Sequence, residues 1–237
     1  MLTREITSVK LLKEASKCYS EADQLYVNSK FMKIALKKYT GIECENIIHP
    51  IVDLGRIIAK EKKQEYITLI NPDEGKGGDI FIKIAKKLPN LKFICVGKGN
   101  EQHHPNAIIN RELSLLKNVT LVSSNDNVSE IYSKTKILLI PSRVDETFSM
   151  VALEAMFNGI PVLASNYGNL PYLIGGGGFN LPIDDIDGWE SAINMLNQDS
   201  GFYKQISEQG LEVSKKYLPE IEMEKFNKLI SNCLGDC

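Results

Sequence analysis

The chain has 237 residues, a formal net charge of −2, a sequence pI near 6.0 and a hydrophobic content of 43%. These values are typical of a globular protein with one large domain, or with a domain and an appendage, and they provide no broad attraction for a polyanion, so nucleic acid is not an expected partner. No apolar run approaches the roughly 18 residues of a membrane span, and the amino terminus lacks the apolar core of a signal peptide, so we expect a cytoplasmic protein.

The first part of the chain predicts short elements. Residues 1–20 have a modest helical pattern, residues 22–29 read as a short strand that ends at a helix cap, and a helix is expected over 30–39. This helix has a lysine-rich face beside apolar residues that include Ile34. Such a face can contact an anionic membrane, but a solvated face over a packed apolar stripe is several times commoner. Membrane contact is therefore expected to be peripheral at most.

A regular α/β alternation begins at Tyr66, after a charged connection over 60–65. We divide the chain into residues 1–55, 56–218 and 219–237. Strands and helices alternate as a doubly wound parallel sheet requires, which makes the predicted fold class α/β and Rossmann-like. The predicted strands are 67–70, 92–96, 119–122, 137–140, 162–164 and 179–182, and the predicted helices are 79–88, 106–117, 127–133, 148–157, 187–196, 202–217 and 220–233.

A glycine-rich loop, residues 71–79, follows the first strand of this alternation. Gly75 and Gly77 permit a tight turn with close backbone approach, Lys76 lies on the turn, and Asp79 is expected to cap the next helix. The loop is neither a Walker P-loop nor a dinucleotide fingerprint, and by itself it is more often only a turn.

The most informative stretch runs over residues 137–165. A continuous apolar strand, 137–140, ends at Pro141, and a segment from 148 to 157 follows in which eight of ten residues are apolar. A helix with no polar stripe should be buried nearly all round. Gly159 is placed to end this helix before the strand 162–164, so the stretch is a βαβ unit.

Two carboxylates belong to this unit, Glu146 before the helix and Glu154 within it. A charged group inside an apolar helix needs a hydrogen-bonding partner, so Glu154 faces either a ligand crevice or the solvent. The crevice of such a unit lies beyond the carboxyl ends of its strands, beside the amino terminus of the helix. Backbone N–H groups there can hold a phosphate, and carboxylates can accept hydrogen bonds from sugar hydroxyls. A nucleotide-sugar combines both kinds of group.

At this point the residues resemble a known family. The spacing Glu146-x7-Glu154, set inside Pro-Ser…Glu-Thr-Phe-Ser-Met-Val…Leu-Glu-Ala-Met…Gly-Ile-Pro-Val-Leu-Ala-Ser, is similar to the donor site of retaining glycosyltransferases of the GT-B fold, group 1 or family 4. The resemblance covers about residues 20–217. Ser149 replaces the glycine that usually follows the phenylalanine.

The resemblance implies a role for each candidate site residue. Glu146 would contact the donor sugar and Glu154 the ribose, while Lys76 would neutralise the diphosphate leaving group. The family usually has an arginine where this chain has Asn71, so one customary cation is absent. The remaining donor-binding residues implied are Gly75, Gly77, Phe148, Ser149, Met150 and Val151 around the phosphates, and Val122 and Ser123 near the base.

No metal or cofactor is expected. His103 and His104, with the distant His49, have neither paired carboxylates nor helical metal-ligand spacing, so loop histidines in solvent are the better interpretation. Five scattered cysteines form no CxxC pair, which argues against a disulfide framework or a zinc site. The resemblance also implies a metal-independent transfer.

The resemblance also implies which partners the chain has. The donor would be a nucleoside diphosphate sugar and the acceptor is unknown. In GT-B enzymes a first domain completes the cleft, and residues 1–55 resemble only its last strand and helix with the hinge. We therefore expect either that domain or a partner subunit. The alternatives are a subunit of a split glycosyltransferase, a nucleotide-sugar-binding module without turnover and, third, a structural interaction protein.

Overall fold

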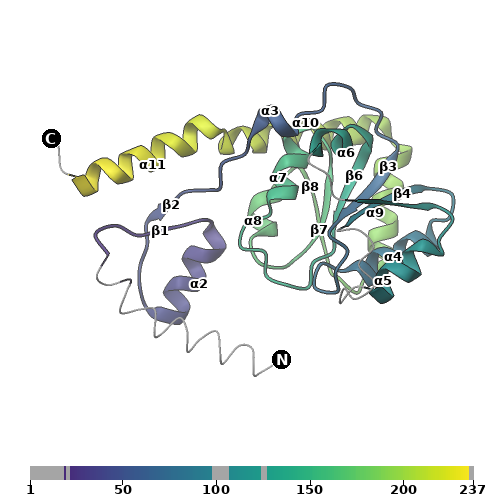
Figure 1. Ribbon diagram of the computed structural model, residues 1–237, viewed down its shortest axis with the longest axis horizontal. Helices are drawn as coiled ribbons and strands as arrows, with labels where there is room; N and C mark the ends of the chain where they lie inside the picture. Colours follow the sequence, from purple (N-terminus) through teal and green to yellow (C-terminus); the bar gives the residue numbers. More distant parts are fainter. Residues whose placement is uncertain (1–18, 20–21, 98–106, 124–126, 235–237) are drawn as a thin grey trace. The chain divides into compact units, whose positions relative to one another are not determined.

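The computed structural model describes residues 19, 22–97, 107–123 and 127–234 (Figure 1). The helical pattern expected over 1–20, except for residue 19, and the histidines His103 and His104 therefore lie outside the described residues. The chain forms two compact units, one of residues 1–51 with 217–237, here called unit 1, and one of residues 52–216, here called unit 2.

Unit 2 contains a six-stranded sheet in which every neighbouring pair is parallel, in the order β5-β4-β3-β6-β7-β8. This confirms the predicted doubly wound α/β sheet, with helices on both of its faces (Figure 1). Its strands are β3 (Tyr66–Ile70), β4 (Lys92–Gly97), β5 (Val119–Ser123), β6 (Thr135–Ile140), β7 (Val162–Ser165) and β8 (Gly178–Leu181). Its helices are α3 (Leu54–Ile57), α4 (Gly78–Lys87), α5 (Ala107–Ser114), α6 (Val128–Lys134), α7 (Met150–Phe157), α8 (Leu170–Ile174), α9 (Ile186–Gln198) and α10 (Ser200–Ser214).

The core of unit 2 lies on both faces of this sheet. Side chains alternate along a strand, so Phe93 and Cys95 of β4 pack against α4, α5 and α9, whereas Ile94 and Val96 pack against Ile131 of α6. Because these strands are covered on both faces, their sequences are continuous apolar runs, and they were predicted from those runs.

Unit 1 is smaller and consists of short elements around the long last helix. They are β1 (Tyr26–Val27), α2 (Lys30–Thr40), β2 (Asn46–Ile47) and α11 (Pro219–Leu234), and the 3-10 turn Lys215–Tyr217 contains the point in the chain at which unit 2 ends and unit 1 resumes. Ser29 caps α2 through a hydrogen bond from the Met32 N–H to its hydroxyl, 3.1 Å long, and Gly41 ends the helix with a φ of 77°. The expected strand and helix at 22–39 are therefore present.

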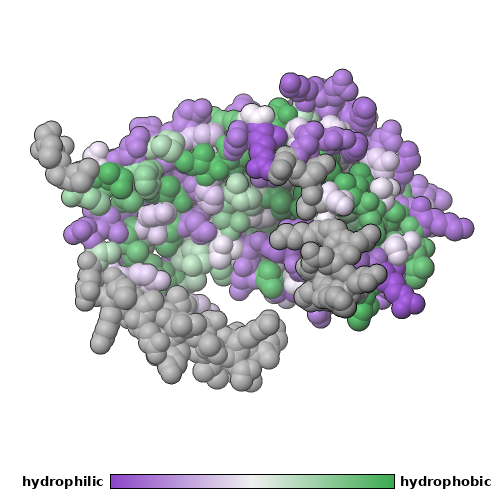
Figure 2. Space-filling view, in the orientation of Figure 1, coloured by the Kyte–Doolittle hydropathy of each residue, from purple (hydrophilic) through white to green (hydrophobic). Residues whose placement is uncertain are grey.

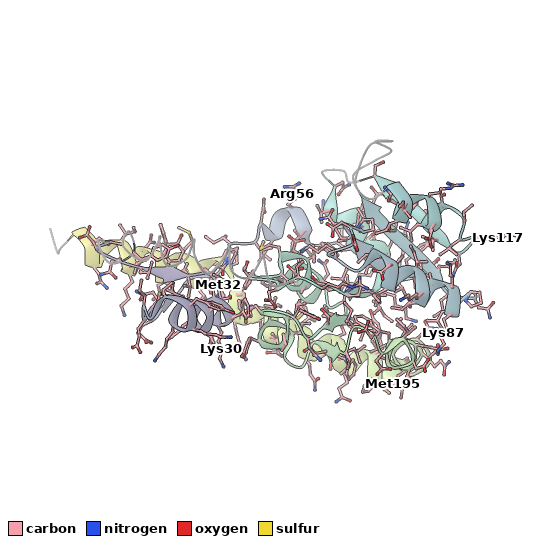
Figure 3. All side chains as sticks on the ribbon, turned by 90° about the horizontal axis from the view of Figure 1, so that it is seen from below. Lys30, Met32, Arg56, Lys87, Lys117 and Met195 are labelled. Carbon is pink, nitrogen blue, oxygen red and sulfur yellow. The ribbon has the colours of Figure 1, made fainter. Side chains whose placement is uncertain are left out.

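The lysine face of α2 is only partly the solvated face that was expected. Lys33 and Lys37 form ion pairs with Glu45 and Glu43, and Lys30 and Met32 lie on opposite sides of the helix (Figure 3). Ile34, expected in the packed apolar stripe, is 46% exposed. None of the helices in the described ranges combines the length and the apolar character needed to cross a bilayer.

Exposed apolar side chains follow the solvent side of α11 (Figure 2). Met223, Phe226 and Ile230 recur at the spacing of one helix face, and each is exposed. Glu222 and Leu229 of the same helix are buried.

Glu222 lies at the centre of a buried polar cluster in unit 1. Its carboxylate accepts a 2.8 Å hydrogen bond from the His49 backbone N–H, lies 2.9 Å from His49 Nδ1 and pairs with Lys225 Nζ at 2.7 Å. The His49 ring also packs edge-on against Tyr217. His49 is therefore not the solvent-exposed loop histidine that was expected, because a carboxylate distant in the sequence covers it.

Replacing Glu222 should destabilise unit 1 in a pH-dependent way. Burial raises the pKa of Glu222, but the hydrogen bonds from Lys225 and His49 outweigh that effect and hold the pKa below the usual range of a glutamate. A lowered pKa in the folded state contributes stability above the unfolded-state pKa, and this contribution is lost as the pH falls through the folded-state value. We expect Glu222→Ala to cost about 2–3 kcal/mol in urea unfolding at pH 7 and clearly less at pH 3. An equal cost at both pH values would contradict a role for the charge.

Candidate functional site

The site lies where the sheet reverses its strand order. β3 and β6 are neighbours, although β4 and β5 lie between them in the sequence. In open parallel sheets the ligand crevice lies beyond the carboxyl ends of the strands at this switch point. The loop after β3 and the loop after β6 meet there, and the Arg143 N–H donates a 2.8 Å hydrogen bond to the Gly75 carbonyl.

The glycine-rich loop has the tight turn that was expected. The Asp73 side chain accepts a 2.7 Å hydrogen bond from the Lys76 N–H, and its carbonyl accepts one from the Gly78 N–H. Gly77 has a φ of 77°, and a Cβ at this position would lie 1.9 Å from the Pro141 carbonyl oxygen. The loop therefore lies directly against the end of β6, at a distance that only glycine allows. Asn71, at the start of the loop, also has a left-handed φ of 60°.

Asp79 does not cap α4 as predicted. The helix begins after Gly77 without a side-chain cap, and the Asp79 carboxylate forms a two-pronged pair with the Arg143 guanidinium, in which Nη2 donates to Oδ2 at 2.7 Å. The pair lowers the pKa of Asp79, mainly through the hydrogen bond from Arg143. Arg143 also donates to the Glu74 carbonyl at 3.3 Å. It thus joins the two loops, a role that no local motif indicated.

Lys76 and Glu146 are brought together by these loops. Lys76 Nζ lies 2.5 Å from Glu146 Oε1, and the side chains are 33% and 12% exposed. The two candidate residues are separated by 70 positions in the sequence. A lysine that ion-pairs a carboxylate at the mouth of a crevice can exchange that partner for a phosphate, which leaves the carboxylate available to hydroxyl groups.

The backbone of Glu146 is held by the loop after β7. The Asn169 N–H donates a 2.6 Å hydrogen bond to the Glu146 carbonyl, and the Gly168 N–H donates to the Asp145 side chain at 3.0 Å. A Cβ on Gly168 would lie 2.4 Å from the Glu146 backbone, and this glycine has a φ of 60°. The isolated glycine in the sequence was the available signal for this close approach.

The helix after β6, α7, begins at Met150, two residues later than predicted. Ser149 is its N-cap, with no hydrogen bond from its side chain. Phe148 and Ser149 are buried, while Met150 and Val151 are partly exposed. The first-turn N–H groups of a helix have no acceptor within the helix and carry partial positive charge. This end of α7 therefore offers donors to an anion.

Glu154 has a partner from the protein itself. The Tyr132 hydroxyl, on α6, donates a 2.6 Å hydrogen bond to Glu154 Oε2. Burial raises the pKa of Glu154, and the hydrogen bond from Tyr132 and the charge of Arg56 only partly offset this effect. The sequence located Glu154 on a mostly apolar helix, but it did not identify Tyr132.

Val122 and Ser123 end β5, two strands from Lys76. Val122 packs partly buried against the cluster of Ile94, Val96 and Ile131, whereas Ser123 is exposed. The structure therefore places them at the same sheet edge as the glycine-rich loop, but not in contact with it.

The four consecutive glycines 175–178 form the turn between α8 and β8, and the end of this turn is closely packed. Gly178 begins β8, and a Cβ there would lie 1.7 Å from the Val162 carbonyl oxygen. A Cβ on Gly177 would meet the Gly210 backbone of α10. These glycines do not line the crevice between β3 and β6.

The arrangement combines one cation, one helix amino terminus and two carboxylates on adjacent elements. Such a set can bind a diphosphate through Lys76 and α7 while Glu146 and Glu154 accept hydrogen bonds from hydroxyl groups. Among the residues that the structure describes, no three His, Cys, Asp or Glu side chains converge as metal ligands would.

Comparison with known families decides the assignment. The family model "Glycosyl transferases group 1" matches residues 55–213. The chain belongs to this family. Among curated relatives, D-inositol 3-phosphate glycosyltransferase of Mycobacteroides abscessus is 26% identical over 208 residues, which cover 77% of this chain and 46% of the relative. The group 1 chain thus spans less than half the length of such relatives.

Solved structures of GT-B glycosyltransferases share the fold of this group 1 chain. Anabaena HepE in complex with UDP has a TM-score of 0.84 at 17% identity, over 94% of this chain and 68% of that one. Sucrose-phosphate synthase from Thermosynechococcus elongatus has a TM-score of 0.80 at 21% identity, over 99% of this chain and 62% of that one.

Proposed function

We propose that this chain is the donor-binding half of a retaining, family 4 glycosyltransferase that transfers a sugar from a nucleoside diphosphate sugar to an acceptor hydroxyl in the cytoplasm. The observation that carries the proposal is the ion pair between Lys76 and Glu146 at the switch point between β3 and β6, beside the amino terminus of α7. A cation and free N–H groups suit a diphosphate, and a carboxylate beside them suits sugar hydroxyls.

Each group has a defined task in this proposal. Lys76 and the α7 backbone at Ser149 to Val151 stabilise the negative charge on the diphosphate as it leaves. This electrostatic stabilisation is usually the largest contribution of a protein to such a reaction. Glu146 accepts hydrogen bonds from the donor sugar, and Glu154 accepts them from the ribose. Val122 and Ser123 lie where the base would extend along the sheet edge. No metal takes part, because Lys76 and the helix terminus provide the positive charge.

The acceptor site is proposed to lie outside this chain. The curated relatives are about twice as long as the part that this chain matches. A further domain or a partner subunit would then close the cleft over the donor and bring the acceptor hydroxyl to it.

A second candidate is a module that binds a nucleotide-sugar without turning it over. It is favoured by Asn71, which stands where the family usually places a second cation and which adopts a left-handed φ of 60°. The loss of one cation reduces the stabilisation of the leaving diphosphate in the transition state. Binding of the nucleotide-sugar depends less on that charge and would be retained.

A thermal-shift panel of UDP, GDP, ADP and their glucose conjugates tests the proposal. Structures of HepE with UDP and with UDP-glucose make uridine nucleotides the first choice. A ligand at a hundred times its dissociation constant should stabilise the fold by about 2.7 kcal/mol. Stabilisation by none of the nucleotides would contradict a donor site in this chain.

Glu146→Gln separates sugar recognition from nucleotide recognition in the same panel. Because Glu146 pairs with Lys76 and would compete with phosphate for it, removing the charge of Glu146 should leave UDP affinity unchanged or higher. The affinity for UDP-glucose should fall about tenfold, through the loss of charge-assisted hydrogen bonds. Equal effects on both ligands would remove Glu146 from the sugar subsite. Turnover of UDP-glucose with a candidate first domain present then distinguishes the transferase from the binding module.

A further inference from the structure

Tyr132 is a buried aromatic residue whose only polar group is directed at the proposed site. Its side chain on α6 is 1% exposed, and its hydroxyl donates to Glu154 Oε2 at 2.6 Å. A buried phenol hydroxyl needs a hydrogen-bond acceptor. Here the acceptor is a carboxylate on another helix, and the partial burial of its charge costs free energy.

The bond occupies one carboxylate oxygen and leaves the other available. Within the described part of the chain, Glu154 Oε1 receives no hydrogen bond and is not fully buried, so it can accept a hydrogen bond from another group. The hydrogen bond to Oε2 restricts rotation of the carboxylate, so the lone pairs of Oε1 are held in a limited set of directions.

The backbone of Glu154 is fixed as well. The buried Asn158 side chain donates to the Glu154 carbonyl at 2.9 Å and to the Ile57 carbonyl at 3.1 Å, and its Oδ1 accepts from the Ala59 N–H at 2.8 Å. These bonds join α7 to the end of α3. The Glu154 backbone is thus held by Asn158, four residues later, and its carboxylate by Tyr132 of α6.

From this geometry we infer that Tyr132 is a positioning residue that orients Glu154 so that Oε1 accepts a ribose hydroxyl of the donor nucleotide; the inference rests on the proposed function. A pre-oriented acceptor binds with less loss of side-chain entropy than one that must be ordered by the ligand. Tyr132 itself touches no ligand. It acts through the orientation and the charge of Glu154.

The charge is part of the same arrangement. Burial raises the pKa of Glu154, while the hydroxyl of Tyr132 on α6 and the charge of Arg56 on α3 favour the ionised form; Arg56 is labelled in Figure 3. Removing the phenol hydroxyl should therefore raise the pKa of Glu154 further. Nucleotide binding that needs the carboxylate would then weaken at a higher pH than in the wild type.

The test compares the affinities of UDP and 2′-deoxy-UDP by calorimetry in three proteins: the wild type, Tyr132→Phe and the control Tyr203→Phe. Tyr203 is a matched control because its hydroxyl also donates to a protein oxygen, the Lys136 carbonyl at 2.9 Å, at the start of β6 and away from the crevice. The wild type should prefer UDP by about tenfold or more, as expected for a hydrogen bond to a charged group. Tyr132→Phe should reduce this preference to less than about threefold and shift the acid limb of UDP binding to higher pH, while Tyr203→Phe should do neither.

The other possible results distinguish a failure of this inference from a failure of the proposed function. An unchanged preference in folded Tyr132→Phe, or no preference in the wild type, would overturn the inference while the donor site stands. Absence of UDP binding in the wild type would overturn the proposed function and the inference with it. If Tyr132→Phe does not fold, Tyr132→Met, which fills the space without a donor, provides the same comparison.

Discussion

Lys76→Met should weaken the binding of UDP by about 10–100-fold, because a charge-assisted contact with a phosphate is worth roughly 1.5–3 kcal/mol. The loss has two parts. The diphosphate loses its cation, and Glu146, whose carboxylate lies 2.5 Å from Lys76 Nζ, keeps an unpaired negative charge beside the incoming phosphates. Calorimetric titration of UDP into the variant measures the combined effect of these two contributions on the affinity.

The double variant with Glu146→Gln separates these two parts. If repulsion by Glu146 contributes, Lys76→Met should cost less in the Glu146→Gln background than in the wild type. Lys86→Met is the control, since Lys86 lies on α4 and pairs only weakly with Glu112, at 3.5 Å. UDP affinity within threefold of the wild type in Lys76→Met would show that the diphosphate does not bind at this loop.

Gly77→Ala should destabilise unit 2 by more than about 3 kcal/mol or prevent its folding. Two costs add at this position. The φ of 77° is unfavourable for a residue with a side chain, and the new Cβ would lie 1.9 Å from the Pro141 carbonyl oxygen, which is main chain and cannot rotate away. The loops after β3 and β6 would have to separate, so nucleotide affinity should fall with stability in urea unfolding and titration.

Gly201→Ala is the matched control for this substitution. Gly201 lies in the first turn of α10, has no left-handed φ, and its nearest contact would be the Asp199 side chain at 3.4 Å. Alanine there should be neutral or stabilising by up to about 1 kcal/mol. Equal stabilities of the two variants would contradict the close approach between Gly77 and Pro141.

The sequence was sufficient for the sheet because its strands are buried on both faces. Runs such as 137–140 are apolar at every position, and the turns between them contain glycine, proline or a helix cap. The order of the strands was not predicted, but the carboxyl ends of parallel strands lie at one edge, so Lys76 and Glu146 were expected there. The sequence thus predicted that Lys76 and Glu146 lie near each other, and the structure adds that they form an ion pair.

The side-chain pairs around the site were not predictable in the same way. Arg143 with Asp79, and Tyr132 with Glu154, are pairs across different elements whose partners depend on the packing of helices against the sheet. Asp79 illustrates the problem: locally it reads as a helix cap, and the tertiary contact with Arg143 overrides that preference. His49 was misread for the same reason, since Glu222 lies 173 positions away.

The central claim is that the crevice between β3 and β6 holds the diphosphate of a nucleotide-sugar. A crystal structure of this chain with UDP tests it most directly. We predict phosphate oxygens within hydrogen-bond distance of Lys76 Nζ and of the N–H groups at Ser149 to Val151, with a ribose hydroxyl on Glu154 Oε1 and Lys76 moved away from Glu146. A nucleotide bound elsewhere, with the pair between Lys76 and Glu146 intact, would contradict the claim.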